Sequence, residues 1–392
     1  MNHRLPKATG MLAIAALLAI QPEATSAASL DSSQDLDLHP AILLQGGTQN
    51  VQTNAAGFYD FGDRNGDGTR ADAVSPSGIN MGNFSLYCNS GTLSGSLWLD
   101  LNGGDLVSTN GYISTEARDP TGSILIYNVG RVAMGNGKFS TASTSSGNGG
   151  NTGNITIGNV GNPAGPIQVN GLDTSMYGGS QAGNVTISST NDVLIQDAAG
   201  ITTNINVPAY GAGRKRGSVD IRHDGSFFAR AIHATKNQDE TTPGGYLLWD
   251  GDALSNGASG SFSVQLIDTH EIQATGFGGT PASATIQNYR TVTLGSMDAY
   301  NTFWYGGSLT ITNITGNISI TGTVNLDGRF DDRDGILRLA TTGGAIAIGS
   351  RGTTNAFDLS KIDYATFSAP SNSTIYARIL GADGIEADGV TT

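Results

Sequence analysis

The feature of this chain that most constrains its fold is a short phrase that recurs along the sequence. The phrase is a glycine, then serine or asparagine, then alternating apolar and polar residues. Clear copies begin at Gly95, Gly122, Gly153, Gly183, Gly217, Gly260 and Gly307, a degenerate copy begins at Ala282, and Gly82 begins a further candidate. From Gly95 onward, successive copies are 22 to 43 residues apart. Because the phrase is kept while the linkers vary, the pattern is typical of a solenoid, in which insertions fall in loops.

Two further short strands follow the phrase within each repeat. Ile167–Val169 and Val193–Ile195 represent a second strand, whereas Ile113–Thr115, Phe139–Thr141 and Ile272–Ala274 represent a third. Alternation over three to five residues predicts short strands that bury one face. Three strands in roughly 30 residues describe one coil of a parallel β-helix. The eight copies from Gly95 to Gly307 therefore predict about eight coils.

Elementary energetics agree with a stack of such coils. A coil that buries about six apolar side chains gains on the order of 10 kcal/mol, and backbone ordering opposes this by a similar amount. A single coil would leave its strand edges unpaired, so coils must stack. Glycine at the corners permits positive φ and close approach of the backbone.

Two other architectures are disfavoured. A disordered chain would not carry so many phased β-branched residues. A β-sandwich array would show longer strands that recur every 8–12 residues. The expected fold class is therefore all-β, a single-stranded parallel β-helix with capped ends.

The N-terminus has the pattern of a secretory signal peptide over residues 1–28. Arg4 and Lys7 precede an apolar stretch from Met11 to Ile20, and small residues near Ala27 and Ala28 suit cleavage. A membrane anchor is the alternative, but ten apolar residues span about 15 Å as a helix, half of a bilayer core. We therefore expect a secreted or cell-surface protein with no membrane span in its mature part.

The remaining chain divides into three parts. Residues 29–81 lack the phrase and are expected to form an N-terminal cap, because solenoids need a cover over their open end. Residues 82–350 are the repeats. Residues 351–392 are less regular and form a C-terminal coil or cap.

Composition narrows the possible partners. The net charge is −13, which disfavours a nucleic-acid partner because phosphate binding needs a basic face. The single cysteine, Cys88, excludes a disulfide scaffold and a cysteine-based zinc site.

The repeats resemble those of a known class of bacterial surface protein. Residues 178–187, Gly-Gly-Ser-Gln-Ala-Gly-Asn-Val-Thr-Ile, and the following Asn191-Asp-Val-Leu-Ile are similar to repeats of filamentous-haemagglutinin-type and autotransporter-passenger-type proteins. The resemblance covers roughly residues 82–350. It implies a right-handed β-helix outside the cell and a role in adhesion or surface structure. The chain departs from that class in its size and in lacking a translocating barrel.

One loop has the spacing of a calcium site. Asp63, Asn65, Asp67 and Thr69 place oxygen ligands as an EF-hand or dockerin loop does, and a glycine occupies the turn position. The pattern then departs, because the twelfth position is Val74 rather than a bidentate carboxylate. A polar turn rich in Asp and Asn is the alternative.

Two later segments are candidate ligand-binding loops. Trp304 and Tyr305 end the densest aromatic segment, which would stack on sugar rings or pack over an open coil face. Asp331, Asp332 and Asp334 form an acidic loop, which would hold calcium or pair with its own arginines at the surface.

Other polar groups carry less chemistry. Arg214-Lys215-Arg216 is expected to be a solvated turn. His223, His233 and His270 lie at polar positions of strand-like runs without ligand spacing. We therefore expect a secreted or cell-surface protein with a structural or adhesive role, whose partner is extracellular polysaccharide or another cell-surface component and whose sole cofactor is calcium. A polysaccharide lyase or hydrolase on the same scaffold is the alternative, and it requires catalytic groups that converge on one face.

Overall fold

A computed structural model describes residues 78–375 except 84, 88–95, 102, 117–120, 144–150, 211–213, 238–244, 253–254, 256, 258, 273–280, 282, 303–304, 329–334 and 350–361, together with segments 41–43, 49–50, 58–60, 71–74 and 385–390. All regular structure in these residues is β-strand, and the strand pairs are parallel apart from two isolated bridges. The signal peptide, Cys88 and the predicted calcium loop lie outside the described residues. The all-β prediction is confirmed.

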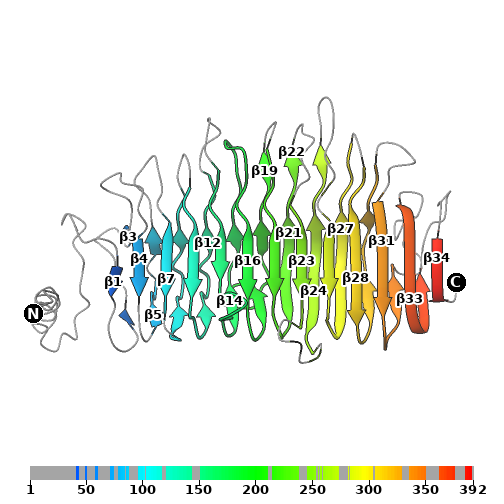
Figure 1. Ribbon diagram of the computed structural model, residues 1–392, viewed down its shortest axis with the longest axis horizontal. Coiled ribbons are helices and arrows are strands. Elements are labelled where there is room, and N and C mark those ends of the chain that lie inside the picture. The colour runs from blue at the N-terminus through cyan, green and yellow to red at the C-terminus, as the bar shows by residue number, and fades with distance from the viewer. Residues whose placement is uncertain are drawn as a thin grey trace, which may run out of the picture.

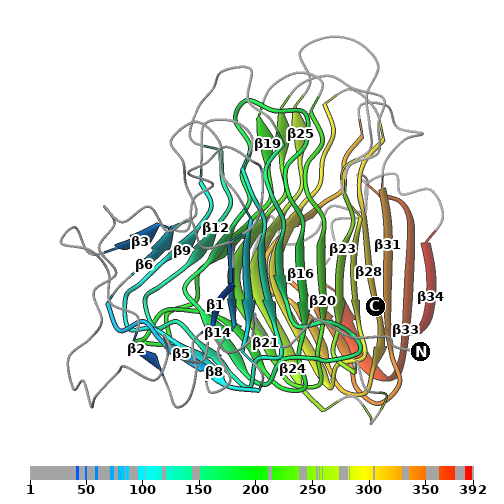
Figure 2. The same ribbon diagram turned by 60° about the vertical axis from the view of Figure 1, so that its left-hand side comes forward.

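The first strands of successive coils form one long parallel ladder, which we call the front sheet (Figure 1). Within the predicted repeat region its strands are β7 (Leu97–Asp100), β10 (Ile124–Tyr127), β13 (Ile155–Ile157), β16 (Val185–Ser188), β20 (Val219–Arg222), β23 (Leu247–Asp250), β26 (Ala284–Gln287), β28 (Ser308–Ile314) and β31 (Gly335–Thr341). These nine strands enclose eight complete turns, as predicted. Figure 2 shows that the chain winds as successive coils stacked side by side along one axis.

Each coil adds two more strands, which pair along the opposite wall. The second strands are β8 (Asp105–Val107), β11 (Val132–Ala133), β14 (Ile167–Val169), β17 (Val193–Ile195), β29 (Ile318–Ile320) and β32 (Ile346–Ile348). The third strands are β6 (Ser85–Tyr87), β9 (Ile113–Ser114), β12 (Phe139–Ser140), β15 (Leu172–Asp173), β18 (Asn204–Asn206) and β30 (Val324–Asn325). In three coils a long strand fills both positions: β21 (Phe227–His233), β24 (Ser261–Asp268) and β27 (Thr291–Asp298).

The parallel ladder continues on both sides of residues 82–350. Before the repeats the front sheet includes β1 (Ala41–Leu43) and β4 (Ala71–Val74), and the opposite wall includes β2 (Gln49–Asn50), β3 (Phe58–Asp60) and β5 (Gly78–Asn80). After the repeats the strands are β33 (Ile362–Ile375) and β34 (Ile385–Val390). A separate small sheet projects as an arm from the middle coils and consists of β19 (Ala209–Tyr210), β22 (Lys236–Asn237) and β25 (Glu271–Ile272).

Two copies of the phrase do not occupy the front sheet. Gly260 leads into β24, and Gly82 precedes β6, both on the opposite wall. The front strand of the coil after β20 is instead β23, which pairs Leu247 with Val219. The spacings before and after Gly260 are uneven because Gly260 leads into a strand of the opposite wall, whereas the preceding and following copies lead into the front sheet. Likewise, Ile272 belongs to the arm rather than to a third strand.

The glycines of the phrase allow neighbouring coils to approach closely. A Cβ atom on Gly153 would lie 1.9 Å from the carbonyl oxygen of Gly122, and one on Gly183 would lie 1.8 Å from that of Gly153. Gly217 repeats this contact at 1.9 Å from the Gly183 oxygen. None of these glycines has positive φ. Close approach of the backbone, rather than left-handed conformation, is therefore what excludes a side chain here.

The residue after the glycine forms a second ladder. The side-chain oxygens of Ser96, Ser123, Asn154, Asn184 and Ser218 each accept a hydrogen bond from the backbone N–H of the equivalent residue one coil later. The threonine that ends a third strand completes the corner, because buried Thr141 donates to the Gly153 carbonyl at 2.6 Å and Thr174 donates to the Gly183 carbonyl at 2.6 Å. The recurring residues thus satisfy each other's polar groups across a buried turn.

The interior is a continuous apolar column of aligned Ile, Val and Leu side chains. In the middle coils it changes to rings, where Phe227, Trp249, Phe262 and Tyr289 pack with centroids 5.5 to 6.0 Å apart. His223 joins this cluster and is fully buried. The expectation of a polar position for His223 was therefore wrong.

Candidate functional site

The structure describes only part of the predicted site residues. Asp63, Asn65, Asp67 and Thr69 lie outside the described residues, as do Trp304, Asp331, Asp332 and Asp334. Tyr305 is described and its side chain is 42% exposed. The predicted calcium and ligand-binding loops therefore stay predictions, and the described residues point to a different place.

That place is the outer side of the third strands. Register aligns one outward position through six consecutive coils, occupied by Asp173, Asn206, His233, Asp268, Asp298 and Asn325. All six side chains are partly exposed. Because each coil lies about 4.8 Å from the next, the column brings together side chains that are 27 to 35 residues apart in sequence.

The column is densest at the end of β24, where the chain bends into the arm (Figure 2). Asp268 Oδ1 and His270 Nδ1 lie 2.5 Å apart, and Asp268 Oδ2 lies 3.4 Å from His233 Nδ1. Side chains two residues apart on a straight strand would be separated by roughly 6.5 Å. The bend at Thr269 is what brings Asp268 and His270 into contact.

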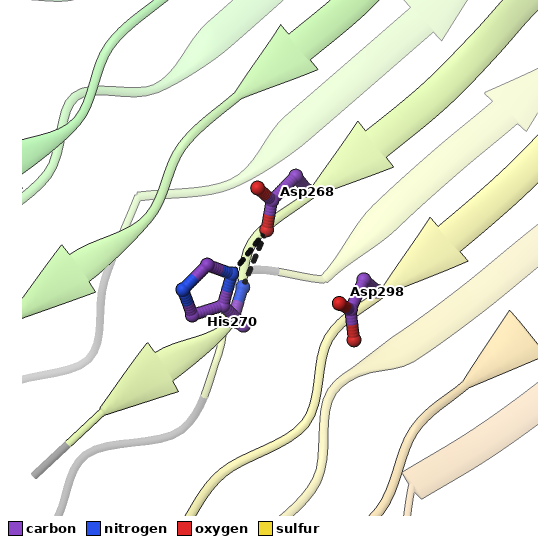
Figure 3. Close-up of side chains that lie close together, drawn as sticks. All are labelled: Asp268, His270 and Asp298. Atoms are coloured by element: carbon purple, nitrogen blue, oxygen red, sulfur yellow. Dashed lines mark hydrogen bonds and ion pairs between the residues drawn. The ribbon is translucent and has the colours of Figure 1, made fainter.

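Asp298 completes the cluster from the next coil (Figure 3). One ligand atom from each of Asp268, His270 and Asp298 can be chosen such that all three lie within 4.8 Å of one another. Asn325, one coil further on, donates to Asp298 Oδ1 at 3.0 Å. The three side chains therefore form a half-buried group of two carboxylates and one imidazole, which we call the Asp–His–Asp cluster.

Aromatic rings flank the cluster on the same face. Tyr300 stacks on the His270 ring with a centroid distance of 5.1 Å and an interplanar angle of 3°. Two and three coils earlier, at the base of the arm, Tyr177 and Tyr210 stack at 4.8 Å, and Tyr177 is 46% exposed. Arg214 donates to the backbone carbonyls of both tyrosines.

The ionisable groups of the cluster have perturbed pKa values. Burial would raise the pKa of Asp268, but hydrogen bonds from His233 and His270 outweigh it and hold that pKa at about 2. The hydrogen bond to Asp268 raises the pKa of His270, against burial and the charge of Arg216. Burial, followed by the negative charge of Asp268, raises the pKa of Asp298. Two neighbouring carboxylates thus differ in their affinity for a proton.

Arg216 lies beneath the cluster and corrects the expectation for the basic segment. Its side chain is 2% exposed, and its guanidinium donates to the carbonyls of Thr269 at 2.9 Å and Ala234 at 3.2 Å. Arg216 is therefore a buried side chain that hydrogen-bonds to the backbone of neighbouring coils, and it is not part of a solvated turn.

Sequence reasoning missed this cluster because its members belong to different coils. His270 has no ligand spacing along the chain, yet register places Asp298 beside Asp268. The available signal was the alternation Asp268-Thr269-His270 at the end of a predicted strand, combined with Asp298 at the end of the following one.

Comparison with family models, with characterised proteins and with solved structures found no match. Among the described residues, no helix is long and apolar enough to cross a membrane.

Proposed function

We propose that this protein is an exported surface solenoid with a structural or adhesive role, and that it binds extracellular polysaccharide. The observation that carries this proposal is the stack of exposed Tyr177 on partly exposed Tyr210 beside the outward polar column. Aromatic rings offer flat apolar faces to sugar rings, while neighbouring carboxylates and amides accept and donate hydrogen bonds to hydroxyls. The resemblance of the repeats to filamentous-haemagglutinin-type and autotransporter-passenger-type proteins supports the same role.

A binding screen tests the proposal. The purified mature protein is applied to a glycan array and sedimented with insoluble polysaccharides. An aromatic contact is worth about 0.5–1.5 kcal/mol, so Tyr177→Ala with Tyr210→Ala should weaken binding roughly tenfold. Tyr246→Ala is the matched control, because Tyr246 is 53% exposed but directly precedes β23 of the front sheet. Equal binding by the double variant and the control would contradict the proposed surface.

A second candidate function is hydrolysis of polysaccharide, and the carboxylate pair favours it. Asp298 has a raised pKa and Asp268 a lowered one, which suits a general acid and a base or nucleophile. An oxygen of one carboxylate lies within 4.8 Å of an oxygen of the other, so both could act on the same glycosidic bond, as the paired carboxylates of glycosidases do. Release of reducing ends from polysaccharides, abolished by Asp298→Asn but kept by Asp173→Asn, would support this candidate. Absence of release from every polysaccharide that binds would reject it.

A further inference from the structure

We propose that Asp268, His270 and Asp298 form a binding site for one divalent transition-metal ion of the zinc and manganese class. The proposed polysaccharide binding does not require this ion, and the two ideas can fail separately. Three features of the described residues support the site: the placement of the ligand atoms, the contacts that hold each ligand, and the balance of charge around them.

The ligand atoms are already close to the arrangement that such an ion needs. Bonds of about 2.1 Å in a tetrahedral site place ligand atoms roughly 3.4 Å apart. The three atoms of the cluster lie within 4.8 Å of one another, and the closest pair, Asp268 Oδ1 and His270 Nδ1, is 2.5 Å apart. Side-chain rotations that move the ligand atoms by about 1 Å would separate Asp268 Oδ1 from His270 Nδ1 and bring the Asp298 carboxylate closer to both. The remaining positions of the ion would be filled by water or by a ligand.

Each ligand is held from outside by a further protein group. Asn325 Nδ2 donates to Asp298 Oδ1, and His233 lies against Asp268 Oδ2, so one oxygen of each carboxylate is oriented by the protein. The Tyr300 ring stacks in parallel on His270 and fixes the plane of its imidazole. Metal ligands in proteins are oriented by such outer contacts, which raise affinity by limiting the movement of the ligands.

The charges around the cluster favour a cation. Asp268 and Asp298 are carboxylates of adjacent coils at the same register, and both are partly removed from water. Arg216, buried beneath Thr269, offsets one negative charge, while His233 and His270 face Asp268 from the outside. In the metal-free protein the imidazole N–H of His270 bridges to Asp268, and a dication would take the place of that proton.

The donor set selects the class of ion. One imidazole nitrogen with two carboxylate oxygens suits zinc, manganese and their first-row neighbours, whereas calcium and magnesium prefer oxygen ligands alone. The predicted calcium loop at Asp63–Thr69 offers only oxygens. The two sites are therefore distinguishable by the ion that each takes.

Isothermal titration of the mature protein with zinc chloride and with manganese chloride tests the site. The protein carries no polyhistidine tag and is stripped with a chelator first. We expect one equivalent of zinc bound, with affinity at least tenfold weaker in His270→Ala and in Asp298→Asn. Asp173→Asn, which removes a carboxylate of the same column three coils earlier, should bind as the unaltered protein does.

Substitution with cobalt gives an independent readout, since the visible spectrum of bound cobalt reports coordination by the imidazole and should be lost in His270→Ala. Circular dichroism and the unfolding temperature of each metal-free variant show whether the coil stack is retained. No zinc binding at millimolar zinc by the unaltered protein would overturn the proposal. Unchanged zinc binding in both His270→Ala and Asp298→Asn would also overturn it, because the ion would then lie elsewhere.

Discussion

Acid should destabilise this protein through one buried imidazole, that of His223. The His223 side chain is fully buried among Phe227, Phe262 and Tyr289. Its Nδ1 accepts a hydrogen bond from the Gly225 N–H at 3.2 Å, so the proton sits on Nε2, which donates to the Tyr289 hydroxyl at 2.7 Å. A second proton would have to occupy Nδ1, against that N–H and without water.

The size of the effect follows from the pKa. Burial lowers the pKa of His223 from 6.5 to about 4, although Asp250 and the Asn191 backbone act in the opposite direction. Between these values the unfolded chain carries a proton that the folded chain does not, so stability falls as pH falls. The slope is about 1.4 kcal/mol per pH unit, and roughly 3 kcal/mol is lost from pH 7 to pH 4.

Urea unfolding at pH 7, 6, 5 and 4.5 measures this slope. His223→Gln keeps a side-chain N–H but does not titrate. As pH falls from 6.5 to about 4, its free energy of unfolding should therefore decrease less steeply than that of the unaltered protein, by about 1.4 kcal/mol per pH unit. Tyr289→Phe removes the hydroxyl partner at a cost of about 1 kcal/mol at every pH and should keep the slope. The two variants therefore separate titration from loss of a hydrogen bond. Identical slopes for His223→Gln and the unaltered protein would refute the reasoning.

Three further pairs of variants test the packing of the coils by urea unfolding. Trp249→Ala should lower the free energy of unfolding by about 3–5 kcal/mol because it leaves a cavity in the ring cluster. Trp249→Phe should cost far less, because it keeps a ring and the buried indole N–H that it removes has no hydrogen-bond partner. Similar losses in the two variants would argue against a packed cluster. Gly183→Ala should cost about 3 kcal/mol by forcing coils apart, whereas Gly161→Ala, with its nearest atom at 3.5 Å, should be nearly neutral. Arg216→Met should cost about 1–3 kcal/mol for each of the two carbonyls that lose its hydrogen bond, and partly exposed Arg214→Met should cost less; the reverse order would contradict a buried role for Arg216.

The fold could be predicted because the coil has a local period. Alternation identified inward residues such as Ile155 and Ile157, and the phrase marked the start of the front strands other than β23 and β31. Because strands of both walls carry the same alternation, the phrase at Gly260 was wrongly assigned to the front strands. A sequence pattern gives the period of a coil but does not say which wall a strand occupies.

The candidate site was beyond the sequence because register across coils depends on the length of every intervening loop. Asp268 and Asp298 meet because 30 residues return the chain to the same place on the wall. The burial of Arg216 and His223 could not be predicted from the sequence either. Arg216 follows two basic residues and His223 follows a charged strand, yet both lie inside, since a turn between coils can carry a side chain inward.

The ladder of Ser and Asn side chains also bears on how such a chain can change its length. Each side-chain oxygen accepts from the backbone N–H of the coil that follows it, so the five consecutive joints from Ser96 to Tyr246 use the same connection. If residues 154–183 were removed in frame, the Ser123 side chain would accept from the N–H of Asn184 and the Gly122 carbonyl would still face Gly153. The Gly153 carbonyl would then face Gly217, as the Gly183 carbonyl does in the intact chain. Whole coils can therefore be added or removed by gene duplication or deletion, because the hydrogen bonds between neighbouring coils stay the same.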